Sequence, residues 1–188
     1  MKKILVVGFL ILAAILLIGL IVNMVPSDED IYIVTMKNNE GEEMGTVTLT
    51  ETKPGVLLDI NLIGLNPHGE HAFHINEKAD CSPITTFQNA GDIYNPFDNA
   101  HGLKHPEGHK AGDMPNLKPD DIGVLKAKVL NFNVTLDPKS DSGRAPLFDQ
   151  DGSSIIIHEG PDDHISQPSG NAGARIMCGE IKLLTASE

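Results

Sequence analysis

The chain has 188 residues, and 14 lysines and arginines against 26 aspartates and glutamates give it a formal net charge of −12 at pH 7. A surface of this sign repels nucleic acid and anionic lipid, which argues against a polyanion as partner. Beyond about the first thirty residues, the chain has the size of one domain with a single sizeable core.

The N-terminal residues have the composition of a membrane segment. Lys2 and Lys3 precede an uncharged apolar run over residues 4–25, which at 1.5 Å per residue is long enough to span a hydrocarbon core of roughly 30 Å. We predict that residues 1–26 form an uncleaved transmembrane helix that anchors an extracytoplasmic domain of residues 27–188 to the cell membrane. The alternative is a cleaved signal peptide and a secreted domain, although residues 23–26 lack a small-x-small cleavage site.

The residues after a short acidic spacer at 27–30 are predicted to form β-strands. Period-two alternation and β-branched residues occur in the segments 31–36, 45–51, 56–63, 122–130, 132–136, 155–158 and 174–184. The separators NNEGEE and TKPG contain the Gly, Asn and Pro that are typical of turns. Roughly eight short strands without an amphipathic helix predict an all-β fold, an eight-stranded Greek-key barrel or sandwich of the immunoglobulin-like kind.

Two long segments fit no strand pattern. Residues 76–121 and 159–173 are rich in Asn, Asp, Gly, Pro and His and show almost no periodicity. A compact domain rarely carries loops of this length unless they have a function. We therefore expect the functional site in these two loops.

The chain has two cysteines, Cys81 and Cys178. An even count in an exported chain favours a disulfide, and closing a loop of about a hundred residues would stabilise the fold by about 4 kcal/mol. The alternative is two unpaired, buried thiols.

All eight histidines lie between residues 68 and 164, at one strand edge and in the two long loops. They are His68, His71, His74, His101, His105, His109, His158 and His164, with Asp113, Asp162 and Asp163 interleaved. A single histidine is more often a surface or hydrogen-bonded residue than a ligand. Imidazole clustered with carboxylate suits zinc or copper, so the pattern predicts a present or ancestral metal site.

Three segments resemble the copper/zinc superoxide dismutases, in the order that this family has them. They are GEHAFHINEKADC (69–81), AGDIYNPFDNAHGLKHPEGHKAGDMPNL (90–117) and IIIHEGPDDHISQPSGNAGARIMCG (155–179). The short final loop is similar to that of the bacterial branch. The resemblance implies a Greek-key barrel, copper and zinc as cofactors, and superoxide as substrate. It leaves the oligomeric state open, with a homodimer as one option.

Residue by residue, the resemblance implies that four of the family's seven metal-ligand positions are kept. His74 and His158 match copper ligands, and His101 and Asp113 match zinc ligands. Each metal would therefore keep two of its four ligands.

The other three ligand positions are changed. Asn76 stands where the family has a copper histidine, Ile93 where it has the histidine that bridges the two metals, and Lys110 where it has a zinc histidine. An aliphatic side chain cannot coordinate a metal, an amide is a poor copper ligand, and a protonated amine repels a cation. We therefore do not expect a working copper site, and we expect dismutase activity to be absent or very low.

The supporting residues of the family are better kept. Arg175 matches the arginine that guides superoxide to copper, and Asp162 matches the carboxylate that links the two metal shells. His71 matches a structural histidine, and Cys81 and Cys178 match the intrasubunit disulfide.

The zinc half has three alternatives. The ammonium of Lys110 could stand in for the positive charge of zinc beside Asp113 and His101, or it could point into water. If the loop is shifted by one residue, His101, His109 and Asp113 could form a three-ligand zinc site.

Three functions are compatible with this pattern. The first is an extracytoplasmic pseudoenzyme kept as a binding or structural module. The second is an impaired superoxide dismutase that recruits His71, His109 or His164 to rebuild its copper site. The third is a copper- or zinc-binding module at the membrane surface.

Overall fold

The computed structural model describes residues 31–182. The predicted membrane anchor lies outside these residues. Within them, no helix is long and apolar enough to cross a membrane.

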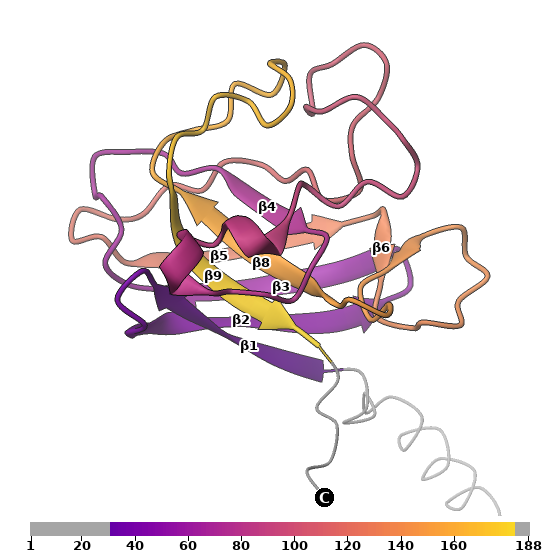
Figure 1. Ribbon diagram of the computed structural model, residues 1–188, viewed down its shortest axis with the longest axis horizontal. Coiled ribbons are helices and arrows are strands. Elements are labelled where there is room, and N and C mark those ends of the chain that lie inside the picture. Colours follow the sequence, from indigo (N-terminus) through magenta and orange to yellow (C-terminus); the bar gives the residue numbers. More distant parts are fainter. Residues whose placement is uncertain (1–30, 183–188) are drawn as a thin grey trace, which may run out of the picture. The chain divides into compact units, whose positions relative to one another are not determined.

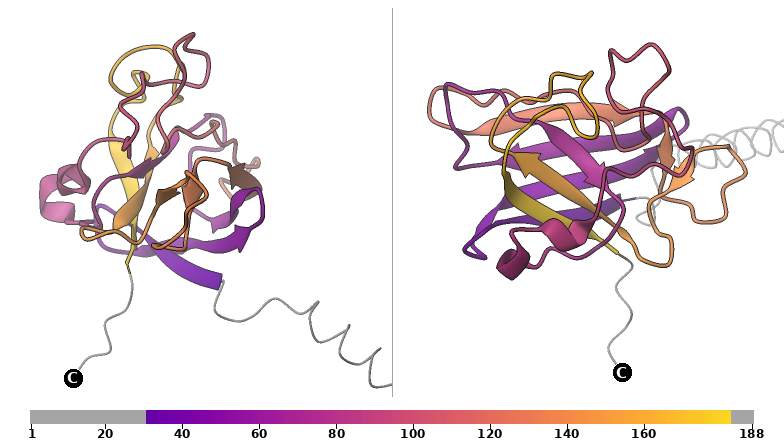
Figure 2. Two further views of the ribbon diagram at one scale, coloured as in Figure 1. Left: turned by 90° about the vertical axis from the view of Figure 1, so that its right-hand side faces the viewer. Right: turned by 45° about the horizontal axis from the view of Figure 1, so that its top comes forward.

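Seven strands form one sheet that curls on itself, so that β4, β8 and β9 lie across β1, β2, β3 and β5 (Figures 1 and 2). The strands are β1 (Ile31–Asn38), β2 (Glu43–Thr52), β3 (Gly55–Leu62), β4 (Phe73–Asn76), β5 (Leu125–Asn131), β8 (Ser153–His158) and β9 (Arg175–Ile181). Their order is β4-β8-β9-β1-β2-β3-β5, and all the pairs are antiparallel. Two short parallel strands, β6 (Val134–Thr135) and β7 (Ala145–Pro146), lie apart. The all-β prediction is confirmed, with nine strands in the described part of the chain in place of about eight.

The alternation seen in the sequence places one face of each strand in the core. Val34, Leu49 and Leu58 from β1, β2 and β3 are buried in one cluster with Phe73 and Ile155 from β4 and β8. Complete burial of each such side chain contributes about 1.5–3 kcal/mol. On β4, the residues between the core residues point away from this cluster, and that is where the predicted site lies.

A disulfide joins Cys81 to Cys178 on β9, with the two Cα atoms 5.6 Å apart. It covers a small apolar cluster that includes Phe87 and Ile156. Two short 3-10 helices, η2 (Pro83–Thr85) and η3 (Gln88–Ala90), lie in the same segment. The predicted cysteine pairing is confirmed, and the disulfide fastens the start of the first long loop to the sheet.

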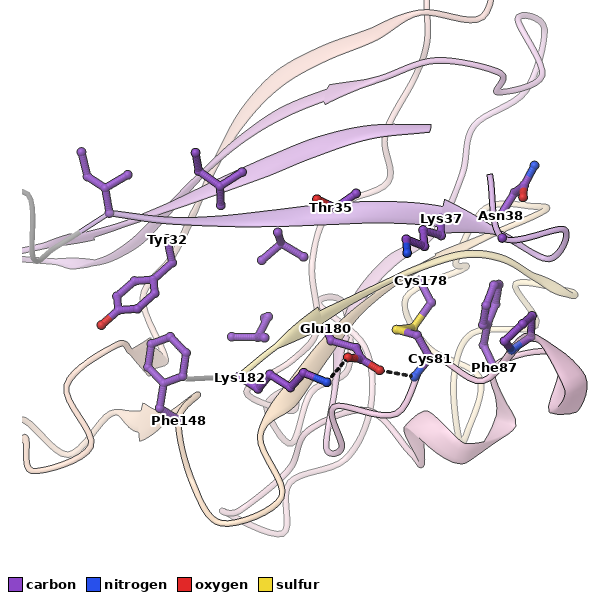
Figure 3. A pocket seen from close by; sticks show the side chains of 16 residues that line it. Tyr32, Thr35, Lys37, Asn38, Cys81, Phe87, Phe148, Cys178, Glu180 and Lys182 are labelled. Atoms are coloured by element: carbon purple, nitrogen blue, oxygen red, sulfur yellow. Dashed lines mark hydrogen bonds and ion pairs between the residues drawn. A yellow bond between two sulfur atoms is a disulfide. The ribbon is translucent and has the colours of Figure 1, made fainter. Parts of the chain in front are cut away.

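Strands β1 and β9 pair only where Lys37 and Asn38 meet Cys178 and Met177. A groove of about 920 Å³ lies between the two strands, lined by side chains of both, by Phe148 and by the disulfide (Figure 3). None of the eight histidines lines this groove, so it is separate from the predicted metal site.

The two predicted loops extend from the same side of the sheet and lie side by side (Figures 1 and 2). Gln167 in the second loop accepts a hydrogen bond from the backbone N–H of His101 in the first (3.0 Å) and donates to its carbonyl (2.9 Å). Asn116 and Asp162 exchange a similar pair of bonds, of 2.8 and 2.9 Å. These contacts bring the histidines of both loops over β4 and β8.

Candidate metal centre

His74 and His158 come from two strands that pair with each other. On β4, Phe73 and Ile75 point into the core, so His74 and Asn76 point to the opposite face, under the loops. His158 ends β8, where the register with β9 shifts. The two imidazole rings meet edge to face, with centroids 5.2 Å apart. The structure thus brings together the two residues that match copper ligands.

Asp162 is the centre of the site. Its Oδ2 accepts a hydrogen bond from His74 Nε2 at 2.9 Å, and its Oδ1 lies 3.1 Å from His101 Nε2. The backbone N–H of His164 donates to Oδ1 at 2.6 Å, and His164 Nδ1 lies 3.3 Å from Oδ2. Burial alone would raise the pKa of Asp162, but the bonds from His101 and His74 outweigh it and hold that pKa well below its usual range. Asp162 therefore links the copper and zinc halves as an ionised carboxylate, in the position that the resemblance implies.

His101 lies between two carboxylates. Its Nδ1 is 2.6 Å from Asp113 Oδ1, and its Nε2 contacts Asp162. Burial lowers the pKa of His101, but the bonds to Asp113 and Asp162 outweigh it and raise that pKa to about 9. At neutral pH, His101 is therefore an imidazolium that donates to both carboxylates.

His158 has the opposite protonation. Burial is the main cause that lowers its pKa to about 4, the nearby charge of Arg175 adds to this, and the bond to Gly173 opposes it. His158 Nδ1 lies 3.1 Å from the Gly173 carbonyl, so a neutral ring donates there and keeps a lone pair on Nε2. His158 thus remains a competent metal ligand.

Two of the changed positions lie beside Arg175. Asn76 donates to the Gly91 carbonyl at 2.9 Å, and its backbone forms an isolated bridge with Ile93, which is buried. Arg175 donates to the same carbonyl and to that of Phe87, each at 2.7 Å. The guanidinium therefore holds the backbone of the first loop as well as lying near the copper residues.

Lys110 follows neither of the two arrangements expected for it. Its ammonium donates to the Pro168 carbonyl at 3.1 Å, and only 9% of the residue is exposed. It is the backbone N–H of Lys110 that donates to Asp113, at 2.9 Å. Among residues 31–182, its ammonium forms no ion pair with Asp113. The side chain crosses to the second loop because a carbonyl there satisfies it.

His109 is not brought to the zinc half. Its Nε2 lies 3.0 Å from Asn133 Nδ2, outside the loop pair, so the structure does not support a site of His101, His109 and Asp113. His71 Nδ1 lies 2.8 Å from the His158 carbonyl, a contact that links the start of β4 to the end of β8.

Other residues that hold the site were not singled out in the sequence. Gln167 and Asn116 hold the backbones of His101 and Asp162, as described above. A Cβ atom at Gly170, where φ is +69°, would lie 1.7 Å from Asp162 Oδ1. Gly170 begins the GNAG motif, and this motif is the feature of the sequence from which Gly170 could have been predicted. The roles of Gln167 and Asn116 could not be predicted, because their contacts depend on how two loops distant in the sequence meet.

The donor atoms fit the two metals differently. In the part of the chain that the structure describes, one group of three potential ligands has its donor atoms within 4.8 Å of one another: His74, His101 and Asp162. On the copper side, His74 Nδ1 is buried with no hydrogen-bond partner among the described residues. On the zinc side, the facing atoms of His101 and Asp113 are already bonded to each other. The copper half thus keeps an open imidazole nitrogen, whereas the zinc half does not.

Comparison with known proteins identifies the family. Residues 43–181 match the family model described as copper/zinc superoxide dismutase (SODC). The chain is 48% identical over 145 residues to superoxide dismutase [Cu-Zn] 2 of Aquifex aeolicus, covering 77% of this chain and 82% of that one. It is 43% identical over 148 residues to superoxide dismutase [Cu-Zn] of Caulobacter vibrioides, covering 78% and 83%. The chain therefore belongs to the copper/zinc superoxide dismutase family.

Solved structures agree with this assignment. A double mutant of a superoxide dismutase-like protein from Bacillus subtilis, with two substitutions to histidine, matches with a TM-score of 0.76 and 37% identity. That match covers 80% of this chain and 97% of the other. The Cu/Zn superoxide dismutase of Brucella abortus matches with a TM-score of 0.62 and 27% identity over 81% of this chain and 99% of the other.

Proposed function

We propose that this domain is a superoxide dismutase-like module whose dismutase activity is absent or very low. Dismutation converts two superoxide ions and two protons into oxygen and hydrogen peroxide, and a copper ion bound by the residues that match the family's copper ligands would supply the one-electron redox chemistry. The observation that carries the proposal is the buried Ile93 at the position that matches the bridging histidine. A hydrocarbon side chain there supplies no ligand to either metal.

The copper half has too few nitrogen donors for this cycle. Of the residues that match copper ligands, His74 has an open Nδ1 and His158 an open Nε2, and the Oδ1 of Asn76 is buried without a partner among the described residues. Two imidazoles suffice for linear Cu(I), but Cu(II) favours a tetragonal field with more nitrogen ligands. Copper held in this way would be bound weakly and would cycle poorly.

A second candidate is a copper-binding module that holds the metal without turning over superoxide. The unpartnered Nδ1 of His74 favours it, because a buried polar atom without a hydrogen bond is costly and a metal would satisfy it. A Bacillus subtilis relative, 38% identical to this chain over 149 residues, is named superoxide dismutase-like protein YojM.

A functional dismutase remains the third candidate, because several relatives are named superoxide dismutase. It would need further ligands from His71, His109 or His164. His71 and His109 use a ring nitrogen at the His158 carbonyl and at Asn133. His164 lies against Asp162. The contact of His109 with Asn133 argues against recruitment of His109.

For location, we propose an extracytoplasmic domain anchored through residues 4–25. The long apolar run supports an anchor, and the disulfide supports an oxidising compartment. Protease added to cells from which any outer envelope has been removed, with the cytoplasmic membrane intact, should degrade the domain. Protection in such cells, with degradation only after lysis of the cytoplasmic membrane, would overturn the proposal.

The activity proposal is tested on the full chain, purified in detergent, loaded with copper and zinc, and dialysed. We expect less than one tightly held copper per chain and superoxide removal no faster than with a copper-free sample. Near-stoichiometric copper with superoxide removal far above that background would overturn it. Stoichiometric copper without activity would favour the copper-binding module.

A matched variant tests whether the missing ligands are the cause. Asn76→His combined with Ile93→His restores both copper positions on the same backbone. We expect this variant to bind more copper and to gain superoxide removal over the unmodified chain. Failure to gain activity despite stoichiometric copper would show that the inactivity has another origin.

A further inference from the structure

The contact between His101 and Asp113 has the length of a hydrogen bond. Zinc holds its ligands tetrahedrally with bonds of about 2.0–2.1 Å, which places two ligand atoms about 3.3 Å apart. Here His101 Nδ1 and Asp113 Oδ1 are 2.6 Å apart, with both side chains fully buried. Since an ionised carboxylate has no proton to give, the imidazole N–H donates to it directly. A separation of 2.6 Å leaves no room for a zinc ion between these two atoms.

The remaining polar atoms of this pair are also satisfied. The second oxygen of Asp113 accepts from the backbone N–H groups of Gly102 and Lys110, at 2.8 and 2.9 Å. His101 Nε2 is bonded to Asp162. Within residues 31–182, buried atoms without partners do occur nearby, at His74 Nδ1 for example, but none belongs to His101 or Asp113.

The other two positions that match zinc ligands, Ile93 and Lys110, supply no ligand, and Lys110 links the two loops. Ile93 is aliphatic, and the ammonium of Lys110 bonds the Pro168 carbonyl of the second loop. This bond spans the two loops, as does the backbone bond from Lys104 to His164 (3.1 Å). The connections that a metal would provide within the first loop are thus made by hydrogen bonds, and further hydrogen bonds join this loop to the second.

We infer that a zinc-free lock, defined as His101, Asp113, Asp162 and Lys110, replaces the structural zinc ion of the family. The domain folds and keeps its two loops together without zinc. This inference concerns the structural metal and does not depend on whether the copper half has activity.

The first test is the response of the unmodified full chain to zinc. Protein purified in detergent is dialysed against zinc or against EDTA, and zinc content and melting temperature are measured. We expect less than 0.1 zinc per chain after removal of excess zinc, and equal melting temperatures in both samples. Stoichiometric zinc, together with a lower melting temperature in EDTA, would overturn the inference.

The second test removes the lock in zinc-free protein. Asp113→Asn should lower the melting temperature in EDTA, because the amide cannot accept from all three N–H donors. Asp121→Asn changes an exposed carboxylate near the end of the same loop and serves as the control, with no expected effect. If Asp113→Asn does not fold, the zinc response of the unmodified chain still decides the question. An Asp113→Asn variant as stable in EDTA as the control would overturn the inference.

A spectroscopic readout separates the lock from an ordinary packing effect. A short bond from imidazole to carboxylate deshields its proton, so zinc-free protein should show a far-downfield N–H resonance in its proton NMR spectrum. The resonance should persist in the Asp121→Asn control and be absent from Asp113→Asn. Its absence from the unmodified, zinc-free chain would contradict the lock. Dismutase activity is measured on other samples, with copper, so failure of one proposal is distinguishable from failure of the other.

Discussion

Replacement of Asp162 by asparagine is the sharpest test of how the two loops are held to the sheet. Both carboxylate oxygens accept hydrogen bonds: one from His74 Nε2, the other from His101 Nε2 and from the backbone N–H of His164. An asparagine side chain has the same shape, but one of its two ends is an NH₂ donor. Whichever way the amide is turned, that donor faces an N–H group.

The expected loss in free energy of unfolding can be estimated from the burial of Asp162 and the charge of its partner His101. Asp162 is 2% exposed, and its neighbour His101 is fully buried and cationic at neutral pH. Loss of a hydrogen bond to a charged group costs about 1.5–3 kcal/mol, and removal of one partner from a buried ion pair costs about 3–5 kcal/mol. Because His101 keeps Asp113, we expect Asp162→Asn to lower the free energy of unfolding by about 3 kcal/mol. In a domain of this size, that corresponds to a fall in melting temperature of roughly 6–12 °C.

The neighbouring residue provides the control. Asp163 accepts hydrogen bonds from Ile165, Ser166 and Asn171, and it is exposed. Asp163→Asn should therefore cause only a small fraction of the shift, measured for both variants by circular dichroism in thermal and denaturant unfolding at pH 7. Equal shifts for the two variants would refute the idea that Asp162 is the point where the loops are joined to the sheet.

Three further outcomes follow from the same contacts. The raised pKa of His101 contributes to the free energy of unfolding in full below the ordinary histidine pKa of 6.5, and this contribution is lost as pH rises through about 9. The lowered pKa of His158 contributes in full above pH 6.5, and this contribution is lost as pH falls through about 4. Denaturant unfolding should therefore show maximum stability near pH 6.5, and a steady rise from pH 6.5 to 9 would contradict this. Gly170→Ala, at positive φ and with its new methyl group against Asp162, should cost at least about 2 kcal/mol in the same assay. Gly143→Ala, also at positive φ but in open space, should cost only about 1 kcal/mol, and equal costs would argue against the close approach at the site. Reduction of the disulfide, whose cysteines are 97 residues apart, should make the free energy of unfolding about 4–5 kcal/mol lower in reducing than in non-reducing buffer. No difference would mean that the bond does not constrain the unfolded chain.

The sheet could be predicted because each strand has one face in the core. The predicted segments 45–51, 56–63 and 155–158 each lie largely within a strand, Glu43–Thr52, Gly55–Leu62 and Ser153–His158. The pattern was less accurate between residues 122 and 136. There the strands are Leu125–Asn131 and the two-residue Val134–Thr135. The strand Val134–Thr135 exists because it pairs with Ala145–Pro146, and alternation of apolar residues in the sequence does not predict this pairing.

The candidate ligand positions follow from motif spacing in the sequence and stay a prediction, whereas the hydrogen-bond partners of Lys110 and His109 could not be predicted. In the sequence, Lys110 stands three residues before Asp113, and His109 directly precedes Lys110. It does not specify that Pro168, 58 residues away, presents a carbonyl to the ammonium, or that Asn133 meets the imidazole of His109. Long, flexible side chains in aperiodic loops take whichever partner the fold presents, so their contacts follow from tertiary structure alone.

The resemblance implies that Asp162 and Arg175 match residues of the family's active site, and their presence could be taken as evidence for activity. Their contacts give a different reason for their presence. Asp162 ties both loops to β4, and Arg175 holds two carbonyls of the first loop from β9. Either residue would be needed to build this domain even if no superoxide reached it. The positions that would separate a redox centre from a scaffold are those whose only role is to bind metal, and the resemblance implies that Ile93 and Lys110 stand at two of them.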